Sequence, residues 1–237
     1  MAAEKKRVIF KLSGEALGGN GKTFDHAAFE AAARMLKAVR ETGVELAVVI
    51  GGGNVWRGRR GDAMQMGAVA ADQMGMLATL QNCLYMRDTL TRLGIAATVM
   101  SAVDVLRFAE PYNAARGAQL LAEGKILLLA CGTGNPFFST DTAVALRALE
   151  LNCDMILMAK NVDGVYTADP NTHPEAELIR DITYDECARR DLKALDADAF
   201  ILLRDNCFPL VRLFAMHPEE NIIKVLGGDP MGTVLHP

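Results

Sequence analysis

Short apolar runs alternate with longer stretches of helical periodicity along most of the chain. Apolar runs of this length predict buried strands, and apolar residues that recur every three or four positions predict helices. The predicted strands are Val8 to Leu12, Leu46 to Ile50, Ala96 to Met100, Ile126 to Ala130 and Met155 to Ala159. The predicted helices are Asp25 to Thr42, a long one that ends near Leu93, Asn113 to Glu123 and Asp141 to Leu151. Repeated units of strand and helix predict an α/β fold with a mainly parallel sheet between helices.

The pattern becomes less regular after the predicted strand that ends at Ala159. The elements predicted there are helices near Tyr184 to Arg190 and Asp196 to Asn206, and strands near Leu210 to Met216 and Gly232 to Leu235. No stretch rich in Pro, Gly or Ser separates this part from the rest. We therefore predict a single domain over residues 1–237, with two lobes of approximately 1–155 and 156–237.

Composition narrows the class of protein. With 237 residues, of which 51% are hydrophobic, the chain can bury a complete core. A net charge of −4 argues against a nucleic-acid partner that is bound by phosphate neutralisation. The five cysteines are widely spaced, which favours reduced thiols over disulfides or a zinc site. The charged start of the chain lacks the apolar core of a signal peptide, so we expect a cytoplasmic protein.

Asp72 is the sole charged residue between Ala63 and Met86. Polar amides and glycines interrupt this apolar run, which predicts a buried helix and no membrane partner. Such a helix must be covered on most faces, so we expect it to form an interface between identical subunits. Two interpretations of Asp72 stay open at this point. Its carboxylate either binds ribose hydroxyls, or bonds to a neighbouring helix end or a partner subunit.

The turn from Thr133 to Asp141 carries the clearest binding signal. It joins an apolar strand to a helix, so free backbone N–H groups and the positive end of the helix dipole meet there. Further donors without bulk are the hydroxyls of Ser139, Thr140 and Thr142. Phe137 and Phe138 lie beside these donors, which suggests that a base or sugar comes with the phosphate. The turn therefore predicts a nucleotide site.

Two other turns after predicted strands carry groups suited to phosphate. Gly51 to Gly53 lets backbone N–H groups approach a ligand closely, and Arg57 offers a planar fork for phosphate oxygens. Lys11, followed by Ser13 and Gly14, places an ammonium at a strand end, and phosphoryl transfer needs such a fixed cation. Each feature also has a purely structural explanation, namely a tight turn for the glycines and a lysine that reaches solvent.

Other candidate groups are less specific. The segment Ala16 to Thr23 matches a loose Walker A pattern, but three residues separate it from the preceding strand, and we interpret it as a loop. Asp141 lies at a helix start, where N-capping alone would explain it. The four histidines show no spacing typical of a metal site, so we assign them no role. A phosphate acceptor is mostly dianionic at pH 7 and needs no general base.

Taken together, these motifs resemble the amino acid kinase superfamily and, within it, the bacterial UMP kinases. The resemblance covers nearly the whole length in order. Its motifs are Lys11 to Leu17, Gly51 to Asn54 with Arg57-Gly58, Asp72 to Thr79, Met86 to Asp88, Met100 to Ala102, Gly132 to Phe138 with Thr140-Asp141, and Val162 to Pro170. The chain departs from the family's Lys-Ala-Thr-Lys pattern at Met158 to Asn161. This departure leaves open whether Lys160 or Asn161 contacts ATP.

The resemblance implies a three-layer αβα sandwich, a homohexamer, and reversible phosphoryl transfer from ATP to UMP with Mg²⁺ in pyrimidine nucleotide synthesis. The first lobe would bind UMP and the second ATP. Implied ATP contacts are Lys11, Leu12, Ser13, Gly14, Gly53, Arg57, Asn161, Tyr166 and Asp169. Implied UMP contacts are Gly52, Asp72, Thr133, Gly134, Asn135, Pro136, Phe137, Phe138, Ser139 and Thr140. Implied catalytic residues are Lys11, Arg57, Asp141, which would orient Lys11 or the waters of the metal, and Asp196, which would organise the phosphate site.

The sequence leaves alternatives open for both the regulation and the activity. Many bacterial members respond to GTP and UTP, and the basic positions between Arg87 and Arg92 do not decide whether this chain does. A relative that phosphorylates a carboxylate, such as acetylglutamate or glutamate kinase, would lack the Asp72 helix and the paired phenylalanines. A non-catalytic oxyanion-binding protein on the same fold would be expected to lose Lys11 or Arg57, and both are present.

Overall fold

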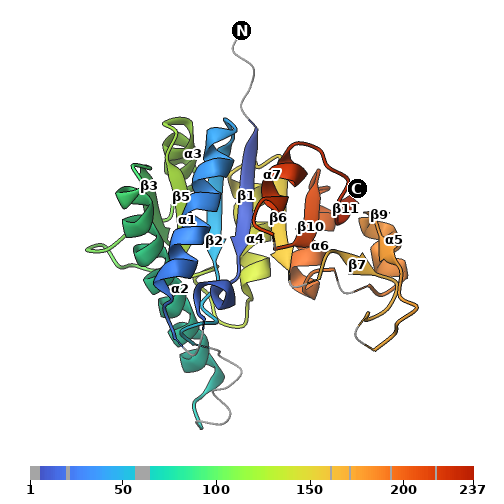
Figure 1. The fold of residues 1–237 in the computed structure, drawn as a ribbon. Coiled ribbons are helices and arrows are strands. Elements are labelled where there is room, and N and C mark those ends of the chain that lie inside the picture. Colours follow the sequence, from blue (N-terminus) through green and yellow to red (C-terminus); the bar gives the residue numbers. More distant parts are fainter. Residues whose placement is uncertain are drawn as a thin grey trace.

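A long, mainly parallel sheet runs through the molecule (Figure 1). The computed structural model describes residues 6–19, 22–56, 65–160, 162–170, 172–192, 194–216 and 218–237. Among them, nine strands pair in the order β4-β3-β5-β2-β1-β6-β10-β11-β9. Their bounds are β1 Arg7–Leu12, β2 Glu45–Ile50, β3 Ala97–Ser101, β4 Glu110–Pro111, β5 Ile126–Ala130, β6 Met155–Lys160, β9 Asp181–Thr183, β10 Val211–Ala215 and β11 Thr233–His236. The pairing of β10 with β11 is antiparallel and the other pairings in this sheet are parallel, which confirms the predicted α/β class.

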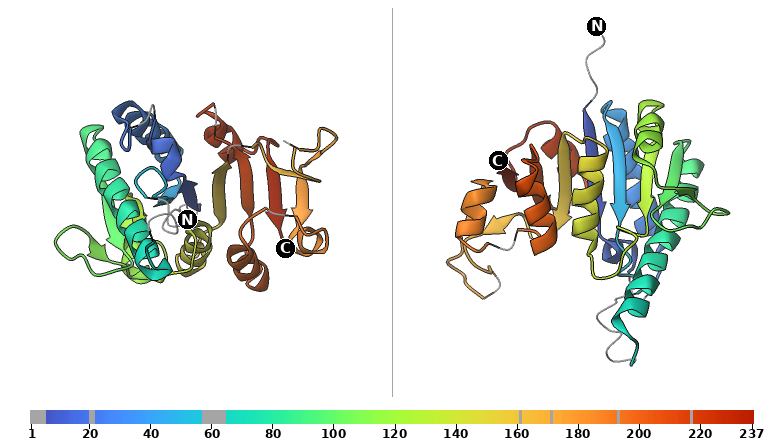
Figure 2. Two further views of the ribbon diagram at one scale, coloured as in Figure 1. Left: turned by 90° about the horizontal axis from the view of Figure 1, so that it is seen from below. Right: turned by 180° about the vertical axis from the view of Figure 1, so that it is seen from behind.

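Helices cover both faces of the sheet, so the fold has three layers (Figure 2). The helices that pack on one face are α1 (His26–Glu41), α2 (Ala68–Arg92) and α7 (Asn221–Leu226). Those that pack on the other face are α3 (Ala114–Ala122), α4 (Thr140–Glu150), α5 (Tyr184–Arg189) and α6 (Ala197–Asp205). Because both faces are buried, the central strands are almost continuously apolar, as parallel sheets require. The predicted αβα sandwich is confirmed.

The alternation of side chains along β1 decides where Lys11 lies. Phe10 and Leu12 pack in the core that contains α1, and Ile9 packs in the core that contains α4. Successive side chains of a strand point to opposite faces, so Lys11 shares the α4 face with Ile9. At the end of β6, Lys160 has the same parity as Ile156 and Met158, which also pack on that face. Both lysines therefore lie on the side of the sheet that carries α4 and α6.

Helix α2 is the long helix that the near-uncharged run predicts. Buried residues concentrate in its second half, from Ala78 to Leu90, and Val69, Met74 and Leu77 in the first half remain 43–45% exposed. One chain therefore leaves part of the helix uncovered, and the predicted interface between identical subunits stays a prediction. No described helix is long and apolar enough to cross a membrane.

Short elements are the part of the fold that the sequence pattern misses. They are the 3-10 helix η1 (Gly14–Leu17), the paired strands β7 (Val165–Tyr166) and β8 (Leu178–Ile179), the edge strands β4 and β9, and the helix α7. Each has two to six residues, which is less than two helical turns or a recognisable run of alternation.

Candidate active site

The turns after β1 and β2 touch at the edge of the sheet where parallel strands end. The Gly51 amide donates a hydrogen bond of 2.9 Å to the Leu12 carbonyl. A Cβ atom on Gly14 would lie 2.4 Å from the Gly51 oxygen and 2.7 Å from the Gly53 nitrogen. Only glycine at this position lets the two turns come so close. The predicted phosphate-binding glycines are thus brought together by direct backbone packing.

Lys11 and Asp141 form a partly buried ion pair at this edge. Their Nζ and Oδ1 atoms are 2.9 Å apart, and the side chains are 18% and 15% exposed. The hydroxyl of Ser139 caps α4, because it accepts hydrogen bonds from the Asp141 and Thr142 amides. The interpretation of Asp141 as the cap is therefore wrong. Its carboxylate lies in the first helical turn, where it is available to the lysine.

Asp196 joins the start of α4 to the start of α6. It caps α6 by accepting a hydrogen bond of 2.9 Å from the Ala199 amide. The hydroxyls of Ser139 and Thr142 donate hydrogen bonds to the same carboxylate. These two hydroxyls, which the sequence offers as phosphate donors, are therefore already engaged by Asp196. The structure assigns this aspartate a role in holding together the two helices beside the ion pair.

Lys160 brings a second lysine to the same group of charges. Its Nζ donates a hydrogen bond of 2.5 Å to the Ala194 carbonyl, two residues before Asp196. Burial lowers the pKa of Lys160. The carboxylates of Asp141 and Asp196 counteract this, and Lys11 adds to it. Asn161 lies outside the described residues, so the choice between Lys160 and Asn161 as an ATP contact stays a prediction.

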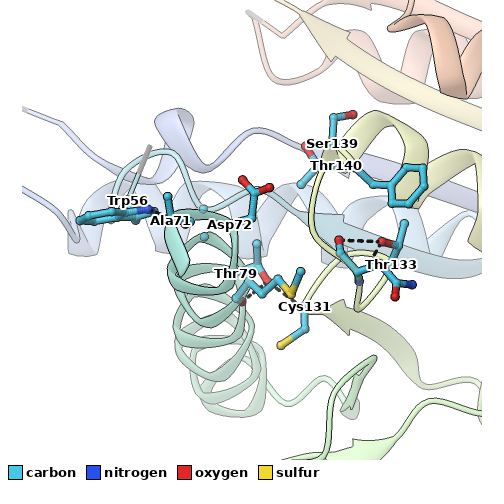
Figure 3. Close-up of a pocket in the computed structure, with 14 residues that line it drawn as sticks. Trp56, Ala71, Asp72, Thr79, Cys131, Thr133, Ser139 and Thr140 are labelled. Carbon is cyan, nitrogen blue, oxygen red and sulfur yellow. Dashed lines mark hydrogen bonds between the residues drawn. The ribbon is translucent and has the colours of Figure 1, made fainter. Parts of the chain in front are cut away.

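A cavity of about 140 Å³ opens between α2 and the turn after β5 (Figure 3). Seven of the predicted UMP contacts line it: Gly52, Asp72, Thr133, Asn135, Phe138, Ser139 and Thr140. Asp72 is half-buried, and its Oδ2 accepts a hydrogen bond of 2.8 Å from the Phe137 amide. The sequence did not predict this backbone bond. The two interpretations of Asp72, namely ribose hydroxyls and a helix end or partner subunit, both stay predictions. Gly134, Pro136 and Phe137 are not among the lining residues.

The backbone of the turn after β5 is held in unusual conformations. Cys131 has φ +64° and Phe137 has φ +72°, although side chains disfavour the left-handed region. Gly134 has φ +84°, and a Cβ there would lie 2.8 Å from the Ala102 carbonyl oxygen. Residues in such conformations cluster at ligand sites, where the surrounding structure has to enforce them. Phe137 itself is 70% exposed.

The sequence analysis misses several residues that line this cavity. Trp56 is the chain's single tryptophan and follows the glycine turn, which is a signal that could have found it. Its Nε1 donates a hydrogen bond of 2.8 Å to the Ala71 carbonyl at the start of α2. Thr79 accepts a hydrogen bond of 2.8 Å from the Cys131 amide. Its one sequence signal is that it lies seven positions after Asp72, on the same helix face.

A second cavity of about 310 Å³ lies at the ends of β1 and β6. Its lining residues are Ser13, Glu15, Ala16, Gly18, Ala159, Lys160 and Met216. Tyr166 and Asp169 line neither of these two cavities, and the Tyr166 hydroxyl donates a hydrogen bond to Asp163. Arg57 lies outside the described residues. The assignments of Arg57, Tyr166 and Asp169 to ATP therefore stay predictions.

Comparison with known proteins places this arrangement in a family. The amino acid kinase family matches residues 6–211. A protein of Nocardioides sp. named uridylate kinase is 44% identical over 231 residues, which are 97% of each chain. The chain belongs to the amino acid kinase family. Solved structures support the shared kinase fold over almost the whole chain.

Three solved structures of this amino acid kinase fold are informative. UMP kinase from Ureaplasma parvum has a TM-score of 0.93 and 30% identity, covering 99% of this chain and 100% of that one. UMP kinase from Bacillus anthracis has a TM-score of 0.93 and 34% identity, covering 98% and 96%. Uridylate kinase from Archaeoglobus fulgidus has a TM-score of 0.74 and 23% identity, covering 96% of this chain and 99% of that one. It supports the fold alone.

The contact between the glycine turn of this amino acid kinase and α2 generates a testable prediction. In Gly52→Ala, the added Cβ would lie 2.9 Å from the Gly75 oxygen and 2.9 Å from the Ala78 Cβ. Overpacking of about 1–3 kcal/mol should exceed the gain of about 0.4–1 kcal/mol from a less flexible unfolded chain. We expect the free energy of unfolding, measured in urea, to fall.

Gly67→Ala is the matched control, because a Cβ there meets nothing within 4 Å. Gly67 is also the N-cap of α2, where alanine caps less well than glycine, and this loss offsets the gain from a less flexible unfolded chain. We therefore expect this variant to unfold close to the urea concentration of the unmodified chain. Equal stability of the Gly52 and Gly67 variants would show that the turn does not pack on α2 as described.

Proposed function

We propose that the chain transfers the γ-phosphoryl group of ATP to UMP, producing ADP and UDP. The observation that carries this proposal is the pair of cavities lined from two touching turns. Gly52 lines the cavity beside α2, and Ser13 lines the cavity at the ends of β1 and β6. The protein named uridylate kinase, which is 44% identical over 97% of both chains, supports the same activity.

In this proposal UMP occupies the cavity beside α2, within a lobe of approximately residues 1–155. The Asp72 carboxylate is half-buried and has lone pairs left beyond its bond to the Phe137 amide, so it can accept hydrogen bonds from ribose hydroxyls. Thr133, Asn135 and Phe138 line the same cavity and contact the base and sugar. The remaining assignments to UMP are Gly134, Pro136, Phe137, Ser139 and Thr140.

ATP occupies the cavity at the ends of β1 and β6, beside a lobe of approximately residues 156–237. In this proposal the phosphates bind at the contact of the two turns, along the backbone of Leu12, Ser13, Gly14 and Gly53. Lys160 lines this cavity with an ammonium whose pKa is lowered by burial, so a phosphate there would favour its charged form. Further ATP contacts in the proposal are Arg57, Asn161, Tyr166 and Asp169.

The chemical step requires charge neutralisation rather than a base. A UMP phosphate oxygen attacks the γ-phosphorus in line, and the bond to the bridging oxygen of ADP breaks. Lys11 stabilises the negative charge spread over the transferring group, and Asp141 holds its ammonium in place by the 2.9 Å ion pair. Asp196 fixes the start of α4, and with it the position of Asp141.

Mg²⁺ is the metal that we propose to accompany ATP. Within the described residues no group of three or more His, Cys, Asp or Glu side chains could hold a metal ion. Asp141 fits an ion held mainly by phosphate oxygens and water, because Mg²⁺ sites commonly use one or two carboxylates, whereas Asp196 already accepts three hydrogen bonds. When bound, the ion would neutralise charge on the phosphates.

We further propose a cytoplasmic homohexamer that acts in pyrimidine nucleotide synthesis and responds to GTP or UTP. The exposed apolar side chains of Val69, Met74 and Leu77 on α2 support self-association, because such residues are usually covered in a finished assembly. Effector binding would be favoured by the basic residues at the end of this helix, Arg87 and Arg92.

The first prediction of the proposal concerns the phosphate acceptor. Release of ADP, measured by a coupled assay with ATP and Mg²⁺, should be rapid with UMP and slow with CMP, GMP and N-acetylglutamate. Turnover with N-acetylglutamate at the rate of UMP would instead support a kinase that phosphorylates carboxylates. Absence of turnover with every acceptor would support a binding protein on the same fold.

The second prediction concerns Lys11. Lys11→Ala should lower kcat several hundredfold or more, because removal of one preorganised electrostatic group typically costs about 10²–10³ in rate. Lys37→Ala is the control, because Lys37 is an exposed lysine whose contact with Glu41 lies at 4.0 Å. A near-normal kcat for the Lys11 variant would refute its catalytic role.

A further inference from the structure

Two asparagine side chains form a reciprocal amide pair beneath the glycine turn. The Asn82 Nδ2 atom donates to the Asn54 Oδ1 atom at 2.7 Å, and the Asn54 Nδ2 atom donates back to the Asn82 Oδ1 atom at 3.0 Å. Asn82 belongs to α2 and is fully buried, whereas Asn54 closes the turn after β2. Burial of an amide costs free energy unless the amide makes its hydrogen bonds.

The same pair also bonds to the two loops that meet at the site. The Asn82 Nδ2 atom donates a second hydrogen bond, of 2.7 Å, to the Gly51 carbonyl. The Asn54 Nδ2 atom donates at 2.8 Å to the Thr23 carbonyl, in the loop that follows β1 and η1. Both donor hydrogens of each amide are therefore used, and together the bonds join α2, the turn after β2 and the loop that contains Thr23.

These contacts complete a polar stripe along α2. Asp72, Thr79 and Asn82 are spaced by seven and three residues, which places them on one face of the helix. Asp72 bonds to the Phe137 amide and Thr79 to the Cys131 amide, both in the turn after β5. Within the described part of the chain, Asn82 is the one of the three that bonds to the turn after β2. One rigid helix thus sets the distance between the two turns.

We propose that the Asn82–Asn54 pair is a positioning element that fixes the Gly51 to Gly53 turn for phosphate binding. It acts through the backbone of the turn, since neither side chain lines the two cavities. The identity of the phosphate ligand as UMP rests on the proposed function. The positioning of the turn rests on the hydrogen bonds alone.

The chemistry of the pair selects the test variant. Asn82→Asp keeps the size and shape of the side chain, but a carboxylate has no N–H group to donate. Two acceptors, the Gly51 carbonyl and the Asn54 Oδ1 atom, would then face a carboxylate oxygen. The turn should detach from α2 locally, without a cavity that would disturb the core.

Hydrogen exchange tests the positioning directly. The Gly51 amide bonds to Leu12, and the Val55 and Trp56 amides both bond to Gly52. We expect Asn82→Asp to accelerate exchange of these three amides at least tenfold. The amides of β5 should exchange at the unmodified rate. Asn206→Asp is the matched control, because Asn206 is an exposed asparagine at the end of α6.

Ligand binding tests the consequence. Titration calorimetry should give a UMP dissociation constant at least tenfold higher in Asn82→Asp, with the dissociation constant of uridine unchanged. If the Asn82 variant does not fold, Asn54→Ala replaces it in the test. This change, at a half-buried position, should weaken UMP binding less strongly and again leave uridine binding unchanged. Unchanged exchange at the three amides, or equal weakening of UMP and uridine, would overturn the inference. If the unmodified chain shows no UMP turnover while Asn82→Asp still accelerates exchange, the proposed function is refuted and the positioning role is not.

Discussion

The close packing of two turns at the carboxyl edge of the sheet is the constraint on which the site depends. β1 and β2 are neighbouring parallel strands in register from Arg7 with Glu45 to Leu12 with Ile50, so their ends meet at one level. Gly14 lies against Gly51, so the backbones of the two turns meet at this edge. The contact between the turns is therefore made by backbone atoms. Such a site needs its turns held by their surroundings, and α2 and α4 hold them.

The charged groups follow from the same geometry. Strand alternation sends Lys11 and Lys160 to the face that carries α4 and α6. On that face Asp141 lies in the first turn of α4, and Asp196 caps α6. Ser139 and Thr142 tie α4 to Asp196, so the carboxylate that faces Lys11 has a fixed position. This cluster places cationic charge beside backbone donors while the whole chain stays acidic. A focused site of this kind would bind phosphate without attracting nucleic acid along a surface.

Periodicity was sufficient to predict the long elements, because a buried parallel strand or a helix of several turns leaves a pattern of its own. The strand from Ile126 to Ala130 was predicted to the residue. The bond from Asp72 to the Phe137 amide and the amide pair of Asn54 and Asn82 could not be predicted, since they join segments 65 and 28 residues apart. The sequence left capping open as an explanation of Asp141, because Ser139 and Asp141 are both good capping residues and tertiary contacts decide between them.

The central claim is that two nucleotides meet phosphate to phosphate above the contact of Gly14 with Gly51. A crystal structure with UMP and a non-hydrolysable ATP analogue tests it most directly. The account predicts a UMP phosphate oxygen about 3–3.5 Å from the γ-phosphorus, with the Lys11 ammonium bound to the γ-phosphate. Phosphates in cavities that do not meet, or a Lys11 ammonium turned away from both of them, would contradict it.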